Sequence, residues 1–250
     1  MSEPDSGSDL ASVRSRAARD GDNWVINGRK IWTSFAHISQ YILMLCRTGE
    51  PGGRQQGLSQ FLVPLDTRGI TIRPIHNMAG RHDFNEVLFE DVRVPADGLV
   101  GQEGAGWAQV ISELAFERSG PERFLSSFVL LEEFVTRARR APSAESAALI
   151  GSLVARLVPL RGMSMSIAVQ LGQGAAPNFE AALVKEAGSI FEQDISERLL
   201  SEFASKADPT SPDRYERLLA EAVLHAPAFS IRGGTREILR GIIARDLGLR

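Results

Sequence analysis

Two Glu-Arg pairs stand five residues apart in the segment "LAFERSGPERF", which runs from Leu114 to Phe124. A carboxylate beside a guanidinium belongs either to a solvated helix face or to a general base, because a base that removes a proton must itself be ionised. Composition alone favours a surface position for Glu117. The segment therefore raises the question of whether one of its glutamates does chemistry.

Local sequence patterns assign the two glutamates different roles. Ser119-Gly-Pro-Glu122 matches a capping box, with a serine N-cap, a proline in the first turn and a glutamate that reaches back. The pattern predicts that one helix ends near Arg118 and a second begins at Gly120, with Glu122 as a capping residue. Glu117 then lies at the break, beside the positive N-terminal end of the second helix, where a carboxylate stays ionised.

Other reactive side chains indicate no metal or disulfide chemistry. The one cysteine, Cys46, lies in the apolar run "YILMLC" and is expected to be a buried small hydrophobe. Four scattered histidines show no ligand spacing; they are His37, His76, His82 and His225. We expect no metal site.

Composition bounds the class of protein. The chain has 250 residues, of which 43% are hydrophobic, enough for a real core and two domains. The net charge is −3 with no long run of one sign, which argues against nucleic-acid partners and polybasic membrane binding. With no signal peptide and no apolar stretch long enough to span a bilayer, the expectation is a reduced, soluble, cytoplasmic protein without a membrane span.

Residues 1–99 are predicted to form a β-domain. The stretch "NWVINGRKIWTS" has an Asn-Gly between two apolar runs, which predicts a hairpin turn. Four more strand-like runs follow, each bounded by Gly, Pro or Asp; they are "QYILMLCRT", "LSQFLVPL", "GITIRPI" and "NEVLFEDVRVP". Without intervening helices, these strands predict an antiparallel β-sandwich or a barrel-like domain.

Residues 100–250 change to helical periodicity. Apolar stripes predict one helix around Trp107 to Leu114 and another from Phe124 to Val135. Two long helices joined by "GQGAAPN" follow, then a polar segment, another helix and a closing helix in "GGTREILRGIIARDL". The predicted class is therefore α+β, with an antiparallel four-helix-type bundle after the β-domain.

Six motifs in this order resemble the acyl-CoA dehydrogenase family of flavoenzymes: "SEPDSGSD", "NGRKIWTS", "FEDVRVP", "GQEGAGW", "LAFER" and "GGTREILRGIIA". The family fold consists of an N-terminal helical domain, a middle β-domain and a C-terminal four-helix bundle, with FAD between them. The resemblance implies that this chain supplies the second and third domains. The chain begins with the turn-forming segment "SEPDSGSDL" right after Met1, and the expectation is that it starts in the middle of a larger ancestral fold.

The resemblance also implies cofactor contacts. Ser8 would approach both FAD and the substrate, Trp32 would lie against the isoalloxazine, and Thr33 and Ser34 would donate hydrogen bonds to its edge. Thr235, Arg236 and Glu237 would contact the flavin from the last helix. From the residues alone, Trp32 could instead be an ordinary sheet-face aromatic, and Thr235 a helix N-cap. For Thr235 both readings can hold, because a helix N-terminus also binds anions.

The family reaction removes an α-proton and a β-hydride from an acyl-CoA, which yields a trans-2-enoyl-CoA and passes electrons to an electron-transfer flavoprotein or similar acceptor. Many members carry the base directly before the C-terminal Gly-Thr, a position that is Gly233 here. Others carry it in a Glu-Arg pair after the β-domain. The resemblance therefore implies Glu117 as the catalytic base and Arg118 as its substrate-side neighbour, with Ser8, Gly233 and Gly234 lining the substrate.

Two family motifs that reach FAD across subunits are absent. The Arg-x-x-Phe-Gly pattern is replaced by "VTRARRAPSAES", and the Gln-rich Gly-Gly loop by "ADPTSPDRYERLLAEAVLHAPAF". Three alternatives remain open: an active enzyme that forms oligomers, a subunit of a hetero-oligomer that shares FAD sites with a related chain, or a truncated chain, either an inactive remnant or a fragment of a longer protein.

Overall fold

The computed structural model describes residues 1–49, 53–203 and 205–249 and divides into two compact units, Met1–Ile111 and Ser112–Arg250. The division lies inside helix α1 (Gly106–Ser119), later than the predicted boundary between residues 99 and 100. Strand β7 (Leu99–Val100) pairs with β4 (Leu58–Pro64) and so belongs to the sheet. The start of α1 also packs on β4, since a methyl group at Gly106 would lie 2.7 Å from the Leu58 carbonyl oxygen.

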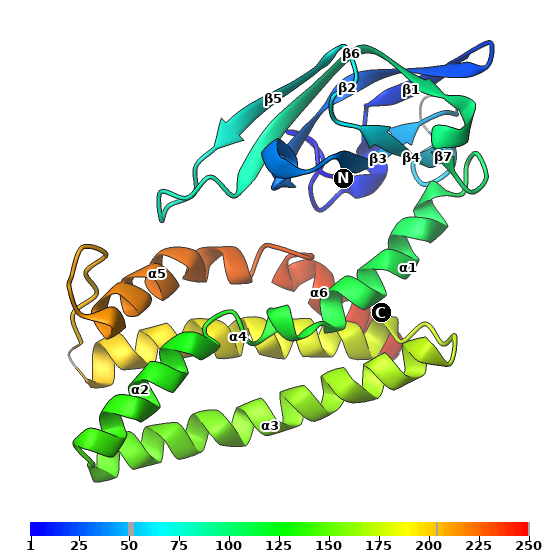
Figure 1. Ribbon diagram of the computed structural model, residues 1–250. Helices are drawn as coiled ribbons and strands as arrows, with labels where there is room; N and C mark the ends of the chain where they lie inside the picture. The colour runs from blue at the N-terminus through cyan, green and yellow to red at the C-terminus, as the bar shows by residue number, and fades with distance from the viewer. Residues whose placement is uncertain (50–52, 204, 250) are drawn as a thin grey trace. The chain divides into compact units, whose positions relative to one another are not determined.

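The first unit is built on one seven-stranded sheet with the order β5-β6-β2-β1-β3-β4-β7 (Figure 1). The remaining strands are β1 (Arg16–Asp20), β2 (Asn23–Ser34), β3 (Tyr41–Arg47), β5 (Ile70–Ile75) and β6 (Phe84–Pro95). Its core contains Trp24, Ile26, Met44, Phe61 and Val87. All pairings are antiparallel except that of β1 with β3, which is parallel through Arg16 and Arg47. The sheet is therefore mixed rather than fully antiparallel.

The hairpin predicted at Asn27-Gly28 is wrong, because β2 runs unbroken through these residues. The turn between β1 and β2 lies instead at residues 21–22. Asn27 and Gly28 occupy an irregularity in the β2–β6 register, where the Asn27 side chain donates to Asp91 and accepts from its backbone N–H, both at 2.9 Å. A side chain at Gly28 would collide with Ser15, the residue before β1, so the glycine permits a close approach of the two backbones rather than a turn.

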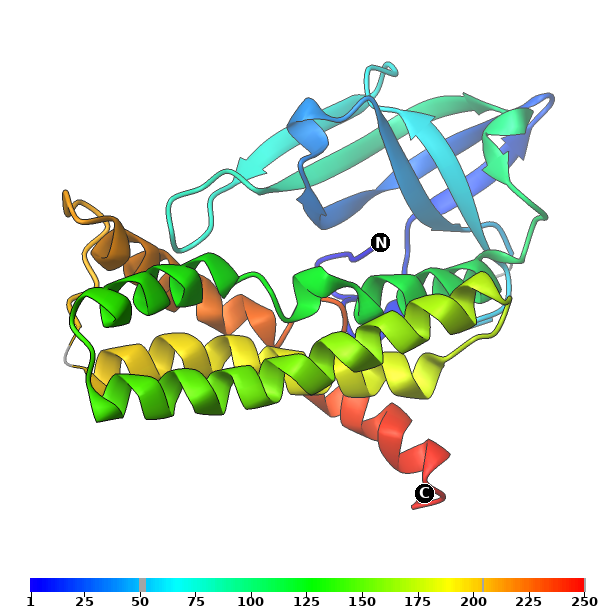
Figure 2. The same ribbon diagram turned by 60° about the horizontal axis from the view of Figure 1, so that its bottom comes forward.

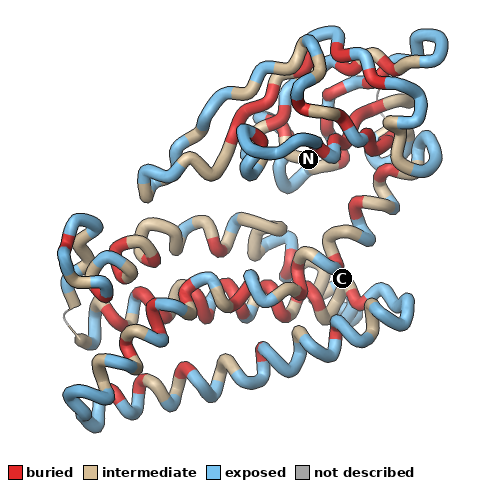
Figure 3. The backbone as a smooth tube through the Cα atoms, in the orientation of Figure 1, coloured by how far each residue is buried: buried red, intermediate tan, exposed pale blue. Residues whose placement is uncertain are grey.

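The second unit is helical, and it confirms the α+β class with a C-terminal helical bundle. Its helices after α1 are α2 (Phe128–Arg140), α3 (Ala144–Gly172), α4 (Asn178–Glu202), α5 (Arg214–Phe229) and α6 (Arg236–Asp246). Helix α4 lies between α3 and α5 and also packs against α6 (Figures 1 and 2). It is the most buried helix of the unit, as the red trace in Figure 3 shows. The bundle core includes Phe124, Leu153, Phe191, Ile195 and Leu219.

Helix α3 begins with a capping box, in which the Ser143 hydroxyl accepts from the Ser146 N–H. It places Leu149, Leu153 and Leu160 in the bundle core. Helix α3 has 29 residues and contains an 18-residue stretch with a mean hydropathy of 1.2, so by length and composition alone it is long and apolar enough to cross a membrane. The expectation that no stretch reaches that length is therefore wrong for this helix.

Candidate active site

The Ser119–Arg123 segment does not form the predicted capping box. The Ser119 hydroxyl donates back to the carbonyls of Ala115 (3.0 Å) and Phe116 (3.3 Å), because a serine in the last turn of a helix can satisfy its hydroxyl on the preceding turn. The turn η4 (Pro121–Arg123) follows without a side-chain cap, and α2 begins only at Phe128. Glu122 is instead a half-exposed side chain 3.7 Å from Arg123 Nε.

Glu117 is held by an arginine rather than by a helix N-terminus. Arg123 Nη2 donates to Glu117 Oε1 at 2.5 Å, and Arg123 Nε donates to the Glu117 backbone carbonyl at 2.9 Å. The Arg123 side chain is only 9% exposed, whereas that of Glu117 is 36% exposed. The carboxylate is therefore fixed from the protein side while part of it stays accessible, as a base requires.

The Gly233-Gly234 loop passes next to this carboxylate. Both glycines have positive φ, 65° and 101°, a region that favours glycine. A methyl group at position 233 would lie 3.1 Å from Glu117 Oε1. Glu117 and Gly233, the two positions at which the family resemblance places a base, are therefore neighbours in the fold.

Arg118 is a buried residue that is hydrogen-bonded to the Gly233-Gly234 loop. Its side chain is buried, and its Nε donates to the Gly233 carbonyl oxygen at 3.1 Å. Burial lowers the pKa of Arg118, and the neighbouring Glu117 opposes that shift. The structure thus brings together Glu117, Arg118, Gly233 and Gly234, while the contact of Arg118 with substrate stays a prediction.

Lys185 of α4 is a further member of this cluster that sequence reasoning missed. Its Cε would lie 3.4 Å from a methyl group at Gly233, and its Nζ donates to the Phe229 carbonyl and to Ser189 Oγ. Burial, with repulsion from Arg123 and Arg232, lowers the pKa of Lys185 to about 8. The one sequence signal was a lysine on the buried face of a helix, four residues before Ser189.

Thr235 is the N-cap of α6, as predicted, with its hydroxyl accepting from the Ile238 N–H. Arg236 is turned to α4, where its Nη2 donates to Glu186 Oε1 at 3.0 Å. Glu237 lies in the first turn, and hydrogen bonds from its own backbone N–H and from Thr235 lower its pKa. The flavin contacts of these three residues stay predictions.

In the first unit, Trp32 adopts an unusual and exposed conformation. Its φ is +58°, it lies at an irregularity in the β2–β6 register, and its side chain is 57% exposed. Bulges that re-aim side chains are common near functional sites. Trp32 touches Phe84 edge-on at a centroid distance of 6.0 Å, so the face of the indole is not stacked on that ring.

The next two residues offer polar groups beside this indole. Thr33 Oγ1 is buried and has no hydrogen-bond partner, and Ser34 is exposed. The backbone at Thr33 is fixed by the buried Asn85, whose side chain donates to the Thr33 carbonyl at 3.1 Å. An exposed aromatic followed by an unsatisfied hydroxyl fits a flat heteroaromatic ring with acceptor atoms at its edge, and FAD meets that description.

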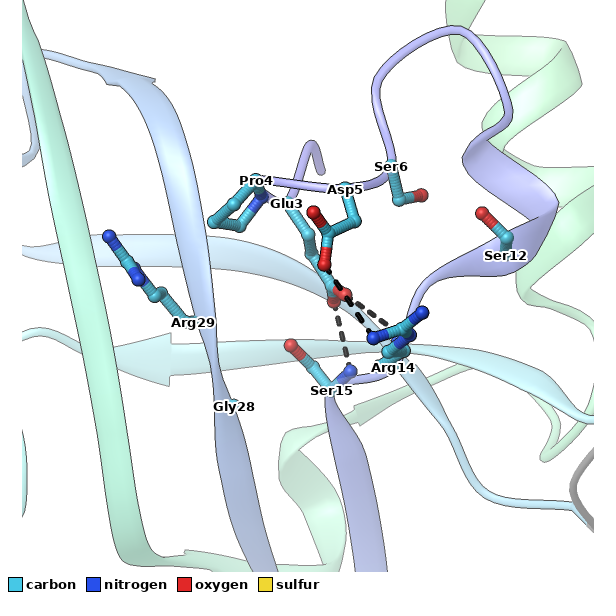
Figure 4. Close-up of a pocket in the computed structure, with 9 residues that line it drawn as sticks. All are labelled: Glu3, Pro4, Asp5, Ser6, Ser12, Arg14, Ser15, Gly28 and Arg29. Carbon is cyan, nitrogen blue, oxygen red and sulfur yellow. Dashed lines mark hydrogen bonds and ion pairs between the residues drawn. The ribbon is translucent and has the colours of Figure 1, made fainter.

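The N-terminal segment is fixed by Glu3. Its carboxylate accepts from Lys30 Nζ (2.8 Å) and from the N–H groups of Arg14 (2.6 Å) and Ser15 (2.9 Å), beside an open pocket of about 250 Å³ (Figure 4). Burial would raise the pKa of Glu3, but Lys30 and these hydrogen bonds outweigh it and lower the pKa. Ser8 is exposed and does not line this pocket.

The chain is similar to known proteins in sequence and in fold. Residues 1–92 match the family model described as acyl-CoA dehydrogenase, middle domain. Acyl-CoA dehydrogenase IpdE1 of Mycobacterium tuberculosis is 40% identical over 253 residues, which cover 99% of this chain and 65% of that protein. The chain therefore spans about two thirds of the length of this relative.

Two solved structures extend the likeness to the fold. The Tcur3481-Tcur3483 steroid ACAD matches with a TM-score of 0.85 and 28% identity, covering 99% of this chain and 66% of that chain. The ChsE4-ChsE5 complex from Mycobacterium tuberculosis matches with a TM-score of 0.83 and 28% identity, covering 100% and 68%. The chain belongs to the acyl-CoA dehydrogenase family, and it comprises the family's middle and C-terminal domains.

Proposed function

We propose that the protein takes part in FAD-dependent α,β-dehydrogenation of an acyl-CoA thioester to a trans-2-enoyl-CoA, with Glu117 as the base. The observation that carries this proposal is the position of the Glu117 carboxylate beside Gly233. A partly exposed carboxylate held by Arg123 can take the α-proton, and a glycine at 233 leaves the space that it occupies.

The chain's own residues then have separate tasks. Glu117 removes the α-proton, and the Gly233 N–H polarises the thioester carbonyl, which stabilises the negative charge that develops on its oxygen. Trp32, with Thr33 and Ser34, would hold the isoalloxazine, and Thr235 to Glu237 would contact the flavin from α6. FAD, when bound, supplies the acceptor for the hydride that leaves the β-carbon. An electron-transfer flavoprotein or similar acceptor would then receive the electrons.

The experiment compares Glu117→Gln with Glu122→Gln in FAD-loaded protein, co-expressed with any related chain that it needs for assembly. Turnover is measured on a panel of acyl-CoA thioesters with an artificial electron acceptor, and bound flavin is measured by absorbance. Because Gln cannot accept the proton, Glu117→Gln should lower the rate by about 10²–10⁴-fold with flavin retained. Glu122→Gln should stay near wild type, since the Glu122 side chain is half-exposed and its 3.7 Å ion pair with Arg123 Nε is longer than a hydrogen bond.

The outcomes separate the alternatives. Wild-type turnover by Glu117→Gln would overturn the base assignment. Loss in both variants would indicate a damaged α1–α2 junction and would also count against it. Absence of turnover in the wild type, with FAD bound and over the whole panel, would favour an assembly subunit or an inactive remnant.

A hetero-oligomeric subunit is the second candidate. Two similar structures are described by paired names, Tcur3481-Tcur3483 and ChsE4-ChsE5, and this chain lacks both motifs that the family uses to reach FAD across subunits. We propose that such an assembly would complete the cofactor site with residues of the related chain.

A further inference from the structure

We propose that Arg123 is a positioning residue that fixes the Glu117 carboxylate next to the Gly233-Gly234 loop, and that Gly188 of α4 positions Arg123. Gly188 does so because it allows the Arg123 backbone to pack closely against α4. This inference rests on the proposed role of Glu117 as base. It concerns two residues that no family motif singled out, one in η4 and one in the middle of α4.

Arg123 makes two bonds to one residue. Its Nη2 donates to the Glu117 carboxylate at 2.5 Å and its Nε to the Glu117 backbone carbonyl at 2.9 Å. That carbonyl belongs to the last turn of α1, where carbonyls lack a partner within the helix. The rigid guanidinium fork therefore links the direction of the side chain to the end of the helix, which a single ammonium group cannot do.

Gly188 determines where the turn with Arg123 can lie. A methyl group at position 188 would lie 2.3 Å from the Arg123 carbonyl oxygen and 3.2 Å from Phe124 Cβ. The first contact is with backbone, so it cannot be relieved by rotating a side chain. Residue 188 must be glycine for η4 to sit on α4, and Phe124 to enter the bundle core, as observed.

The positions of base and loop depend on one another. Glu117 Oε1 would lie 3.1 Å from a methyl group at Gly233, so a small rotation of the carboxylate would change its distance to the loop. A displacement of about 1 Å at a reacting group can cost about 10²-fold in rate. The Arg123 side chain is only 9% exposed, so it acts through Glu117. Moving Arg123 should therefore lower the rate by displacing the Glu117 carboxylate.

The test uses Arg123→Gln, Arg123→Lys and Gly188→Ala in the FAD-loaded protein, with Gly162→Ala as the matched control. Gly162 lies inside α3, and a methyl group there would meet nothing within 4 Å. We expect Arg123→Gln and Gly188→Ala to lower kcat by about 10–100-fold with KM little changed. Arg123→Lys should fall between, added guanidinium ion should partly restore Arg123→Gln, and Gly162→Ala should match wild type.

A second measurement does not need turnover. Carbodiimide coupling of a glycine ester to the carboxylates, followed by tryptic peptide mapping, compares Glu117 with Glu145, an exposed residue at the start of α3 that lies in a different tryptic peptide. The ratio of Glu117 to Glu145 labelling should rise several-fold in Arg123→Gln and Gly188→Ala. An unchanged ratio with unchanged kcat in folded Arg123→Gln would overturn the proposal. A raised ratio in protein whose Glu117→Gln variant stays active would instead retain the positioning role and refute the base assignment.

Discussion

The free energy of unfolding of Lys185→Met relative to wild type should be higher at neutral pH than at alkaline pH. The reason is that Lys185 is a buried cation without a carboxylate in ion-pair contact among the described residues. Its side chain is 0% exposed, and its ammonium donates to the Phe229 carbonyl and Ser189 Oγ. In the described part of the chain it forms no ion pair within 4.0 Å. Burial and two arginines, Arg123 and Arg232, lower its pKa to about 8, from an ordinary 10.5.

The sign of the effect follows from proton binding. Below pH 8 Lys185 is charged in both folded and unfolded chains, so folding carries the full cost of burying the charge. Between pH 8 and 10.5 the folded chain has lost the proton while the unfolded chain still holds it, and stability therefore rises with pH. A shift of 10.5 − 8 = 2.5 pH units corresponds at 1.36 kcal/mol per unit to about 3 kcal/mol. The window from pH 7 to pH 10 does not cover the whole range between the two pKa values, so the rise within it is about 2–3 kcal/mol.

Methionine fills nearly the same volume and carries no charge. Ser189 Oγ still lies 2.8 Å from the Phe229 carbonyl, so that carbonyl keeps a donor. The free energy of unfolding of Lys185→Met minus that of wild type should fall by about 2–3 kcal/mol between pH 7 and pH 10. Any constant cost of the lost hydrogen bonds cancels in this change.

The assay is unfolding in urea, which is uncharged, and the signal is the ellipticity at 222 nm. This signal comes mainly from helices, which lie mainly in the second unit together with Lys185. Lys206→Met is the control. Lys206 is on the surface and its pKa is raised, mainly by the hydrogen bond to Asp208, so its ion pair persists over this pH range and its difference from wild type should stay constant. A Lys185→Met difference independent of pH would refute the reasoning.

Two further predictions concern the cysteine and the assembly. Cys46 is fully buried, and burial raises its pKa to about 12. A disulfide reagent at pH 8 should therefore label Cys46 only as the protein unfolds. Rapid labelling of the native protein would contradict this prediction. Co-expression with a related chain should yield a co-purifying hetero-oligomer with higher FAD content, whereas a stable homo-oligomer with full FAD occupancy on its own would count against the second candidate function.

Long-range periodic patterns predicted most elements of this fold. Helices α3 and α4 span many turns, so their apolar spacing outweighs any single residue. The errors fall on short local signals. Asn27-Gly28 is typical of a hairpin turn, yet its glycine serves an approach to Ser15 that only the folded sheet creates. Ser119 and Glu122 have capping-box spacing, but the Ser119 hydroxyl finds acceptors in the turn before it.

The candidate site shows the same limit. The family resemblance singled out Glu117, Arg118, Gly233 and Gly234, and the structure places them together. It said nothing of Arg123 and Lys185, because their roles depend on how η4 and α4 pack. A bond such as that from Arg118 to Gly233 joins residues 115 positions apart, and no local pattern encodes that distance.

The contact between Glu117 and Gly233 bears directly on why the resemblance allows two positions for one base. In many members, on that resemblance, the carboxylate would come from the position of Gly233, and in others from the end of the helix after the β-domain. A methyl group at 233 would already lie 3.1 Å from Glu117 Oε1 and 3.4 Å from Arg123 Cζ. A longer side chain there would compete with the Glu117 carboxylate for the same volume and the same guanidinium. This close contact and the positive φ of 65° at Gly233 both favour glycine at 233 when the carboxylate comes from Glu117.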